Sequence, residues 1–406
     1  MIYLIMLICG APILYLVRFS VFDVPTTMLE IFIYFSVILT LIIKVYKNEK
    51  FIFPKKEHLL PIFLFIVSGL ISTIMAPDKM QALGLFKAYI IDPILFFFVL
   101  YLNVRNEKQL NYIFVSLMIS AMIVSIHAIY QKIFGINLSD GRVVGIFGYS
   151  PNYLALYLSP LAVLTFGYAF SFLKVNRLSF NFLILIFFLI ACAVIFSGSR
   201  AGIGALAVGL GVYLIIKYFQ AIKSNKIILA LLMPALVAGI YFSWQAMKPD
   251  WDANPASLRA ATSNNIRFEI WKTTLADILP KNGNWIWGVG LGNYQDYFTE
   301  LTKNRVNYPE WISPWALTPH NLFLNIWINL GLLGLASFIW ILILFSKSIG
   351  FQTRYSAVLI SVMAVMISQG LFDSTYWKND LGLVFWIFIG LGLIISDKRF
   401  NGNEET

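Results

Sequence analysis

The sequence predicts an all-α membrane protein, folded as a bundle of about twelve transmembrane helices. Of its 406 residues, 59% are hydrophobic and only 12% are charged, and the mean hydropathy is +0.77. A soluble domain carries about 25% charged residues, so this composition is typical of a membrane protein. Apolar stretches of spanning length recur from end to end. Because lipid offers the backbone no hydrogen-bonding partners, these stretches are expected to be helices.

We predict one membrane domain, residues 1–406. Met1 to Val17 lacks a basic leader and a small-residue cleavage site, so we interpret it as the first span and not as a signal peptide. The long segment 245–319 lies between spans nine and ten and is the one candidate for a folded external subdomain. The predicted spans are 2–17, 27–46, 59–75, 82–102, 110–133, 150–173, 180–196, 201–219, 227–244, 320–346, 354–372 and 380–396.

Lysine and arginine residues predict the orientation of the bundle. With both termini in the cytoplasm, the inner loops carry 16 of the 30 basic residues, the short outer loops and helix ends carry 7, and the long loop carries the other 7. Cytoplasmic loops favour Lys and Arg, so the long loop is predicted to be extracytoplasmic. The net charge of +10 follows this topology, and we expect the lipid bilayer, not nucleic acid, as the surrounding partner.

Four basic residues fall on the predicted outer side, where the topology disfavours them: Lys87, Arg142, Arg200 and Arg267. Each alone is explained by snorkelling to the headgroups or by a local ion pair. Arg267 lies in a segment of the long loop that predicts an amphipathic helix. Its apolar stripe is Phe268, Trp271, Leu275 and Ile278, its expected cap is Asn264 or Asn265, and Pro280 is expected to end it.

The segment P-H-N-L-F-L-N-I-W predicts a histidine at the start of the tenth span. Thr318 suits a helix cap and Pro319 a first helical position, which would place His320 and Asn321 at the helix N-terminus. That end of a helix disfavours imidazolium and attracts anions. A neutral His320 beside an anion is suited to general-base chemistry on a phosphate-linked substrate.

The other motifs give little indication of a functional site. Asp250-Trp251-Asp252 forms a D-x-D pattern that arises often by chance, and Cys9 and Cys192 lie within spans, so no metal site is expected. The glycines of G-V-G-L-G, residues 288–292, lack the spacing and context of a dinucleotide motif and are expected to allow a tight turn. His58 and His127 are expected to serve packing.

Four motifs resemble the O-antigen ligase and polymerase-like superfamily of bacterial membrane proteins, in the order that family has them. His320-Asn321 is followed after nine residues by Gly331-Leu-Leu-Gly334, and R-V-V-G-I-F-G-Y-S-P-N-Y begins at Arg142. S-G-S-R-A-G contains Arg200, and N-I-R-F-E-I-W contains Arg267. The resemblance implies a GT-C-like, metal-independent and cofactor-free glycosyltransferase in the inner membrane, with its active site toward the periplasm or cell exterior.

That resemblance also implies the site. The donor would be a glycan on undecaprenyl pyrophosphate, bound by Arg200 and Arg267 with Arg142 and Lys87 in support. His320 would deprotonate an acceptor hydroxyl, with Asn321 and Trp271 supporting it, and direct displacement would invert the anomeric centre. The acceptor would be lipid A–core for a ligase, which we favour, or a lipid-linked repeat for a polymerase. Protein glycosylation and a lipid-linked glycan flippase or transporter are less favoured alternatives.

Overall fold

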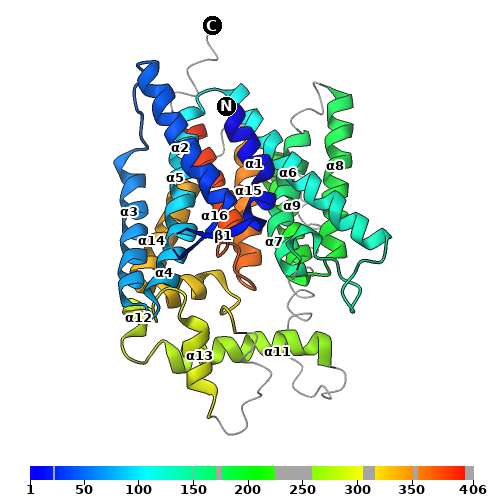
Figure 1. Ribbon diagram of the computed structural model, residues 1–406. Coiled ribbons are helices and arrows are strands. Elements are labelled where there is room, and N and C mark those ends of the chain that lie inside the picture. Colours follow the sequence, from blue (N-terminus) through cyan, green and yellow to red (C-terminus); the bar gives the residue numbers. More distant parts are fainter. Residues whose placement is uncertain are drawn as a thin grey trace.

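The computed structural model describes residues 1–21, 23–148, 150–170, 176–224, 258–304, 316–350 and 355–397. They form a helical bundle in which α1 begins and α16 ends at one end, with the helices α11 to α13 gathered at the other (Figure 1). We call these the terminal end and the loop end. Within the described ranges, nine helices are long and apolar enough to cross a membrane, and two shorter apolar helices accompany them. The all-α polytopic prediction is confirmed.

The helices agree closely with eleven of the twelve predicted spans, and predicted span 227–244 lies outside the described residues, as does the D-x-D pattern. The fourth span is one column in which a π-helical turn, η1, joins α4 to α5. The bounds of the bundle helices are α1 Ile2–Leu16, α2 Met28–Tyr46, α3 Lys56–Met75, α4 Lys79–Phe86, η1 Lys87–Ile91, α5 Asp92–Asn103, α6 Glu107–Ile133, α7 Pro151–Phe170, α8 Arg177–Phe196, α9 Arg200–Ser224, α14 Leu322–Ile349, α15 Ser356–Gly370 and α16 Asn379–Ser396.

Two helices, α7 and α16, form the centre of the bundle, with 89% and 94% of their spanning windows buried. Helix α7 packs against α8, α9 and α15, while α16 packs against α5 and α14. Glycines let neighbours approach α16 closely: Pro93 faces Gly382, and Phe97 faces Gly390. Small residues at such contacts are how helices pack in lipid, where the hydrophobic effect does not drive their association.

A two-stranded hairpin follows the short first helix and was not predicted from the sequence. Strand β1, Arg18–Val21, pairs antiparallel with β2, Val24–Thr27. Helix α1 has 15 residues, so it rises only about 22 Å, less than the ~30 Å of a hydrocarbon core. The hairpin therefore begins at a depth that the longer neighbouring helices still occupy (Figure 1).

The loop-end helices are α11 Leu258–Thr273, the π-helical turn η4 Thr274–Ile278, α12 Asn284–Trp287 and α13 Tyr294–Thr302. The predicted amphipathic helix is present, but the predicted cap is wrong, because α11 begins at Leu258 and holds Asn264 inside. The π turn also breaks the predicted stripe. Ile278 is fully buried, whereas Leu275 is 51% exposed.

Glycines anchor this subdomain to the bundle, as expected for tight turns. Gly288 and Gly290 have φ of 78° and 93°, and a Cβ at Gly290 would lie 2.8 Å from the Cα of Ala76. Gly331, within α14, also allows a close approach between the bundle and the loop-end helices. Its φ of 70° breaks the helix, and a Cβ there would overlap the Ile286 carbonyl oxygen.

Replacing Gly331 with alanine should therefore destabilise the protein. The left-handed backbone and the overlap with Ile286 together should cost about 1–3 kcal/mol or more. Thermal unfolding in detergent measures this as a lowered Tm. The control is Gly204→Ala in α9, where a Cβ meets nothing within 4 Å and the helix should gain slightly. Equal Tm values for the two variants would contradict the strain at Gly331.

Candidate functional site

His320 lies immediately before α14 at the loop end. The helix is capped by Asn321, whose side-chain oxygen accepts a hydrogen bond of 3.0 Å from the backbone N–H of Leu324. The predicted roles of Thr318 as cap and Pro319 as first helical residue are thus wrong, because Asn321 competes better for the cap position. His320 instead has a φ of 46°, a left-handed conformation that is uncommon outside glycine.

Asp373 is the partner of His320 and was missed in the sequence. It lies in the turn between α15 and α16, and its Oδ1 is 3.4 Å from His320 Nδ1. Burial raises the pKa of this carboxyl, but His320 and the guanidinium of Arg267 lower it by more, so its pKa is held below the usual range. The one available signal was an acidic residue in a short turn predicted to lie on the same side as His320.

Asn321 fixes the spacing between His320 and that turn. Besides capping α14, its side-chain amide donates a 3.0 Å hydrogen bond to the carbonyl of Leu371, two residues before Asp373. Deeper in the same helix pair, Asn325 donates a 3.1 Å bond to Ser374. Two amides, Asn321 at the cap and Asn325 one turn into α14, therefore hold the turn against the segment that carries His320.

One face of α11 covers this pair. Asn264, Arg267 and Trp271 follow at spacings of three and four residues, so they share a face. Asn264 Oδ1 accepts a 3.2 Å hydrogen bond from Arg200 Nη2, at the first residue of α9. The Trp271 indole N–H donates a 2.7 Å bond to the carbonyl of Pro319, directly before the histidine. The helix thus connects Arg200 to the histidine turn.

The two arginines are close enough to influence each other. Burial lowers the pKa of Arg267 from its usual value, Asp373 raises it, and the positive charge of Arg200 lowers it further. Arg200, Arg267, His320 and Asp373 therefore form one group at the loop end, where two guanidinium charges face a single carboxylate. Such a group is suited to an anionic ligand.

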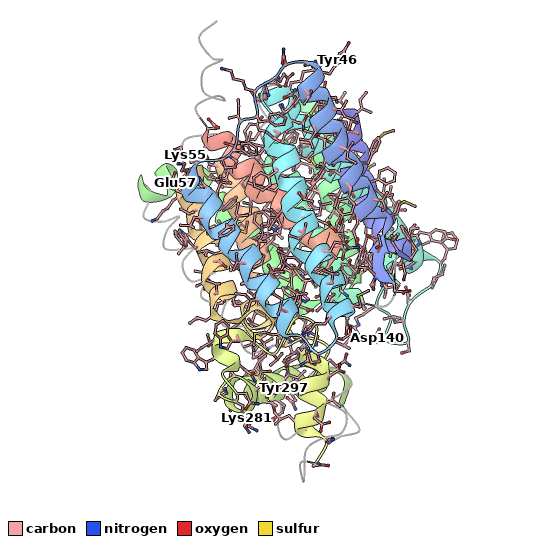
Figure 2. The ribbon with its side chains drawn as sticks, turned by 60° about the vertical axis from the view of Figure 1, so that its left-hand side comes forward. Tyr46, Lys55, Glu57, Asp140, Lys281 and Tyr297 are labelled. Carbon is pink, nitrogen blue, oxygen red and sulfur yellow. The ribbon has the colours of Figure 1, made fainter. Side chains whose placement is uncertain are left out.

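Arg142 lies beside the turn that begins α9. Its side chain packs on Gly198, where a Cβ would come within 2.7 Å of Arg142 Cδ, and its Nε is 2.7 Å from Asp140 Oδ2. Figure 2 places Asp140 toward the same end as Lys281 and Tyr297. The Arg142 side chain is 38% exposed, so its guanidinium remains accessible.

Lys87 is held in a different way. Its ammonium is 2.5 Å from Glu30 and donates to the Pro25 carbonyl at 3.1 Å and the Thr26 hydroxyl at 2.9 Å. These partners belong to β2 and to the start of α2. Lys87 thus forms a local ion pair, one of the two simple explanations expected for a cation at this position.

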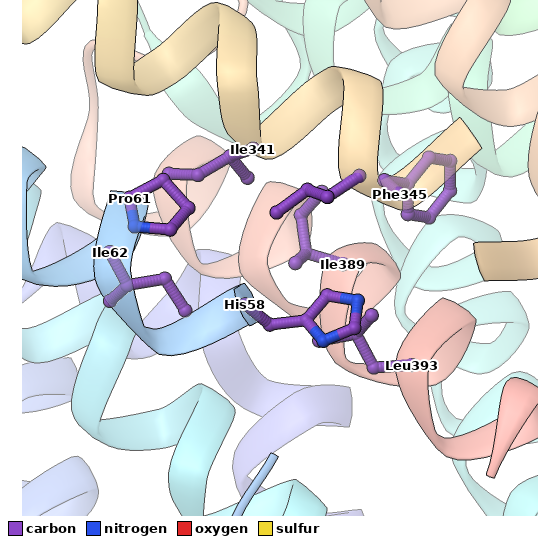
Figure 3. Close-up of a pocket in the computed structure, with 8 residues that line it drawn as sticks. His58, Pro61, Ile62, Ile341, Phe345, Ile389 and Leu393 are labelled. Carbon is purple, nitrogen blue, oxygen red and sulfur yellow. The ribbon is translucent and has the colours of Figure 1, made fainter. Parts of the chain in front are cut away.

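The remaining histidines lie outside this group. Figure 3 shows His58 in a small apolar pocket with Ile341 and Phe345, at the terminal end. Its Nε2 is 2.8 Å from the Ser348 hydroxyl, as expected for a packing residue. The ring of His127, in α6, lies against a neighbouring tyrosine ring, with centroids 6.5 Å apart. Within the described ranges, no group of three or more His, Cys, Asp or Glu side chains could hold a metal ion.

Comparison with known families identifies the segment that carries most of this group. Residues 183–339 match the family model described as O-antigen ligase. This segment is similar to an O-antigen ligase domain. The matched segment contains Arg200, Arg267, His320 and both motif glycines, so the predicted resemblance is confirmed, and the match supports a membrane glycan function of the ligase or polymerase type. No curated protein matches the chain.

The Trp271 hydrogen bond predicts a loss of glycan transfer without loss of the fold. Trp271→Phe keeps an aromatic ring against Phe372 but removes the donor to Pro319. Stability should fall by about 0.5–1.5 kcal/mol, and transfer by about 10-fold, because the turn before the histidine loosens. The control Trp327→Phe removes an equal 2.7 Å bond, to the Trp285 carbonyl. Parallel loss of transfer in both variants would contradict a local role for Trp271.

The lowered pKa of Asp373 predicts a pH dependence of stability. A carboxyl whose pKa is lower in the folded state stabilises fully above its unfolded pKa of about 3.9 and loses this effect as pH falls through the folded value. The Tm difference between wild type and Asp373→Asn should thus be constant from about pH 7 to 5 and narrow only below about pH 4. Exposed Asp296→Asn in α13 is the control. If the Tm difference between wild type and Asp373→Asn disappeared above pH 5, the lowered pKa of Asp373 would be contradicted.

Proposed function

We propose that this protein transfers a glycan from undecaprenyl pyrophosphate to the hydroxyl of an acceptor, with its loop end facing the periplasm or cell exterior of a bacterial inner membrane. The observation that carries the proposal is the His320–Asp373 pair, 3.4 Å apart and within the field of Arg267. A general base and a cationic cradle are the two groups that this reaction needs. The match with the O-antigen ligase family supports the substrate class.

The arginines are assigned to the donor. Arg200 and Arg267 come from different segments, and their guanidinium groups repel each other across a short distance. A pyrophosphate placed between them relieves this repulsion and accepts paired N–H···O bonds from planar guanidinium groups. Arg142, packed against the turn before Arg200, supports the same group, whereas the charge of Lys87 is engaged by Glu30 beside the hairpin. Stabilising the departing diphosphate lowers the barrier directly.

His320 is assigned to the acceptor. With the Nδ1 proton donated to Asp373, the neutral imidazole carries its lone pair on Nε2, and Nε2 is the atom assigned to take up the acceptor's proton. The acceptor oxygen then attacks the anomeric carbon as its proton moves to Nε2, and the bond from that carbon to the diphosphate oxygen breaks. The electron pair leaves on the diphosphate, where the arginines hold its charge. Attack opposite the leaving group inverts the anomeric centre.

Among acceptors, we propose lipid A–core, which makes the protein a ligase. The compact single long loop of the sequence, residues 245–319, favours this choice over the polymerase. The decisive experiment gives the purified protein, in liposomes, an undecaprenyl-pyrophosphate glycan with either lipid A–core or a second lipid-linked repeat. Product on lipid A–core supports a ligase, and a doubled repeat on the lipid carrier supports a polymerase. Movement of the donor across the bilayer without a new glycosidic bond would instead make the protein a transporter.

Substitutions test the two roles. His320→Ala should lower the transfer rate by about 10²–10⁴, the usual contribution of a general base, while His58→Ala, at the terminal end, should retain the wild-type rate. Arg267→Gln should cost about 10²–10³, since it removes a donor to developing charge. Single-turnover rates with purified variants measure both. Transfer by His320→Ala at the wild-type rate would exclude the base role.

A further inference from the structure

A second pair of cations lies on two tyrosine rings, beside the hairpin and the turn that carries Asp373. The guanidinium carbon of Arg18 lies 4.8 Å from the centre of the Tyr15 ring, and the Lys378 ammonium lies 5.7 Å from that of Tyr153. The two rings meet edge to face, with centroids 6.1 Å apart. Cations within about 6 Å of a ring are attracted by its face, so the tyrosine pair fixes where both charges lie.

The platform beneath these cations is rigid. The Tyr153 hydroxyl donates to Asp380, which is fully buried at the start of α16, and Tyr153 also stacks on Phe147, with ring centroids 4.2 Å apart. Next to the lysine, Asn379 donates a 2.7 Å hydrogen bond to Glu30, the carboxylate that pairs with the ammonium in η1. Asp380 and Glu30 are thus hydrogen-bonded to groups that lie beneath the two cations.

The two cations lie at the protein surface. Both are exposed, and within the described ranges neither has a carboxylate oxygen within 4 Å. Every residue of β1 is exposed, although α1 is too short to lift the hairpin clear of the bundle. An irregular backbone at that depth is tolerated where it lines a water-filled cavity. Arg18 and Lys378 are therefore accessible to an anionic ligand.

The turn that carries Asp373 links this pair of cations to the histidine. Asp373 lies in the electrostatic fields of Arg267 and of Lys378, which is five residues further along the same turn. Arg200 acts on Arg267, and Arg18 acts on Lys378. Electrostatic influence thus links Arg200 to Arg267, Arg267 to Asp373, and Lys378 to Asp380, Arg18 and Asp373.

We propose that Arg18 and Lys378 bind the phosphate of a lipid-anchored acceptor and so place its hydroxyl at His320, across from the donor diphosphate. This inference rests on the proposed transfer reaction. Two exposed cations on a fixed aromatic platform recognise a phosphate ester or diphosphate, whether it belongs to a lipid-linked repeat or to a phosphorylated glycolipid. Two cation pairs linked to the partner of one base keep two anionic substrates apart while their reacting ends meet.

Counting bound lipids tests the site without any reaction. Native mass spectrometry of the protein in nanodiscs would be run with undecaprenyl diphosphate alone, and with undecaprenyl diphosphate plus phosphorylated lipid A–core. Wild type should bind two lipids in at least one arm. The double variant Arg18→Gln with Lys378→Gln should bind one, and Arg200→Gln with Arg267→Gln should also bind one. Exposed Lys281→Gln, the control, should bind two.

Two further measurements make the lipid count decisive. Unchanged Tm values for the double variants exclude a folding defect, and the single variant Lys378→Arg, which keeps the charge, should still bind the second lipid. No second lipid in either arm for wild type would overturn the site. A second lipid that survives Arg18→Gln with Lys378→Gln would overturn it as well.

Transfer kinetics then separate this inference from the proposed function. The double variant Arg18→Gln with Lys378→Gln should raise KM for the acceptor at least about 10-fold, as expected for loss of charge-assisted bonds, and leave KM for the donor nearly unchanged. The acceptor that shows this rise identifies the source of the phosphate. An equal rise with an acceptor that lacks phosphate would overturn the inference, as would an unchanged acceptor KM. A wild type that binds two lipids but forms no glycosidic bond would refute the proposed transfer and leave the binding site standing.

Discussion

The site depends on one helix that lies across the loop end and holds two membrane helices in register. Through Asn264, α11 contacts Arg200 at the start of α9, and through Trp271 it holds the Pro319 carbonyl before α14. These contacts are seven residues apart on one helical face, or about 10 Å along the axis at 1.5 Å per residue. Arg267 lies between them, so the helix that sets the spacing also supplies a charge.

The turn between α15 and α16 is the second half of this arrangement. Asn321 caps α14 with its oxygen and holds the Leu371 carbonyl with its amide nitrogen, so a single side chain sets both the start of the helix and the position of the turn. The break at Gly331 lets α12 pack into α14 below this point. His320 and Asp373 therefore meet because two helices are fixed together, and not because of their separation of 53 residues along the chain.

The spans were predicted well from the sequence, because length and apolar composition are local properties that lipid imposes directly. The count of lysine and arginine residues in the predicted loops also placed Arg200 and His320 on the same side of the membrane. Asp373 was not predicted, because which short turn meets the histidine depends on how the helices pack. The start of α11 was misplaced too: Asn264 suits a cap, but tertiary contact with Arg200 holds it inside a longer helix. The hairpin at Arg18 was missed because strands this short have little pattern.

Electrostatics explains why the cations are arranged in pairs. Arg200 and Arg267 repel, as do Arg18 and Lys378, and Asp373 lies in the fields of one member of each pair. Asp380 also acts on Lys378, so two carboxylates face four cations, and part of the charge of Asp373 is engaged by the histidine. The remaining positive potential is lowered only when anions occupy the site, so the empty arrangement favours phosphate ligands before any contact forms. Since Asp373, the partner of the histidine, is influenced by both pairs, two bound anions would bring their sugar ends toward the same imidazole.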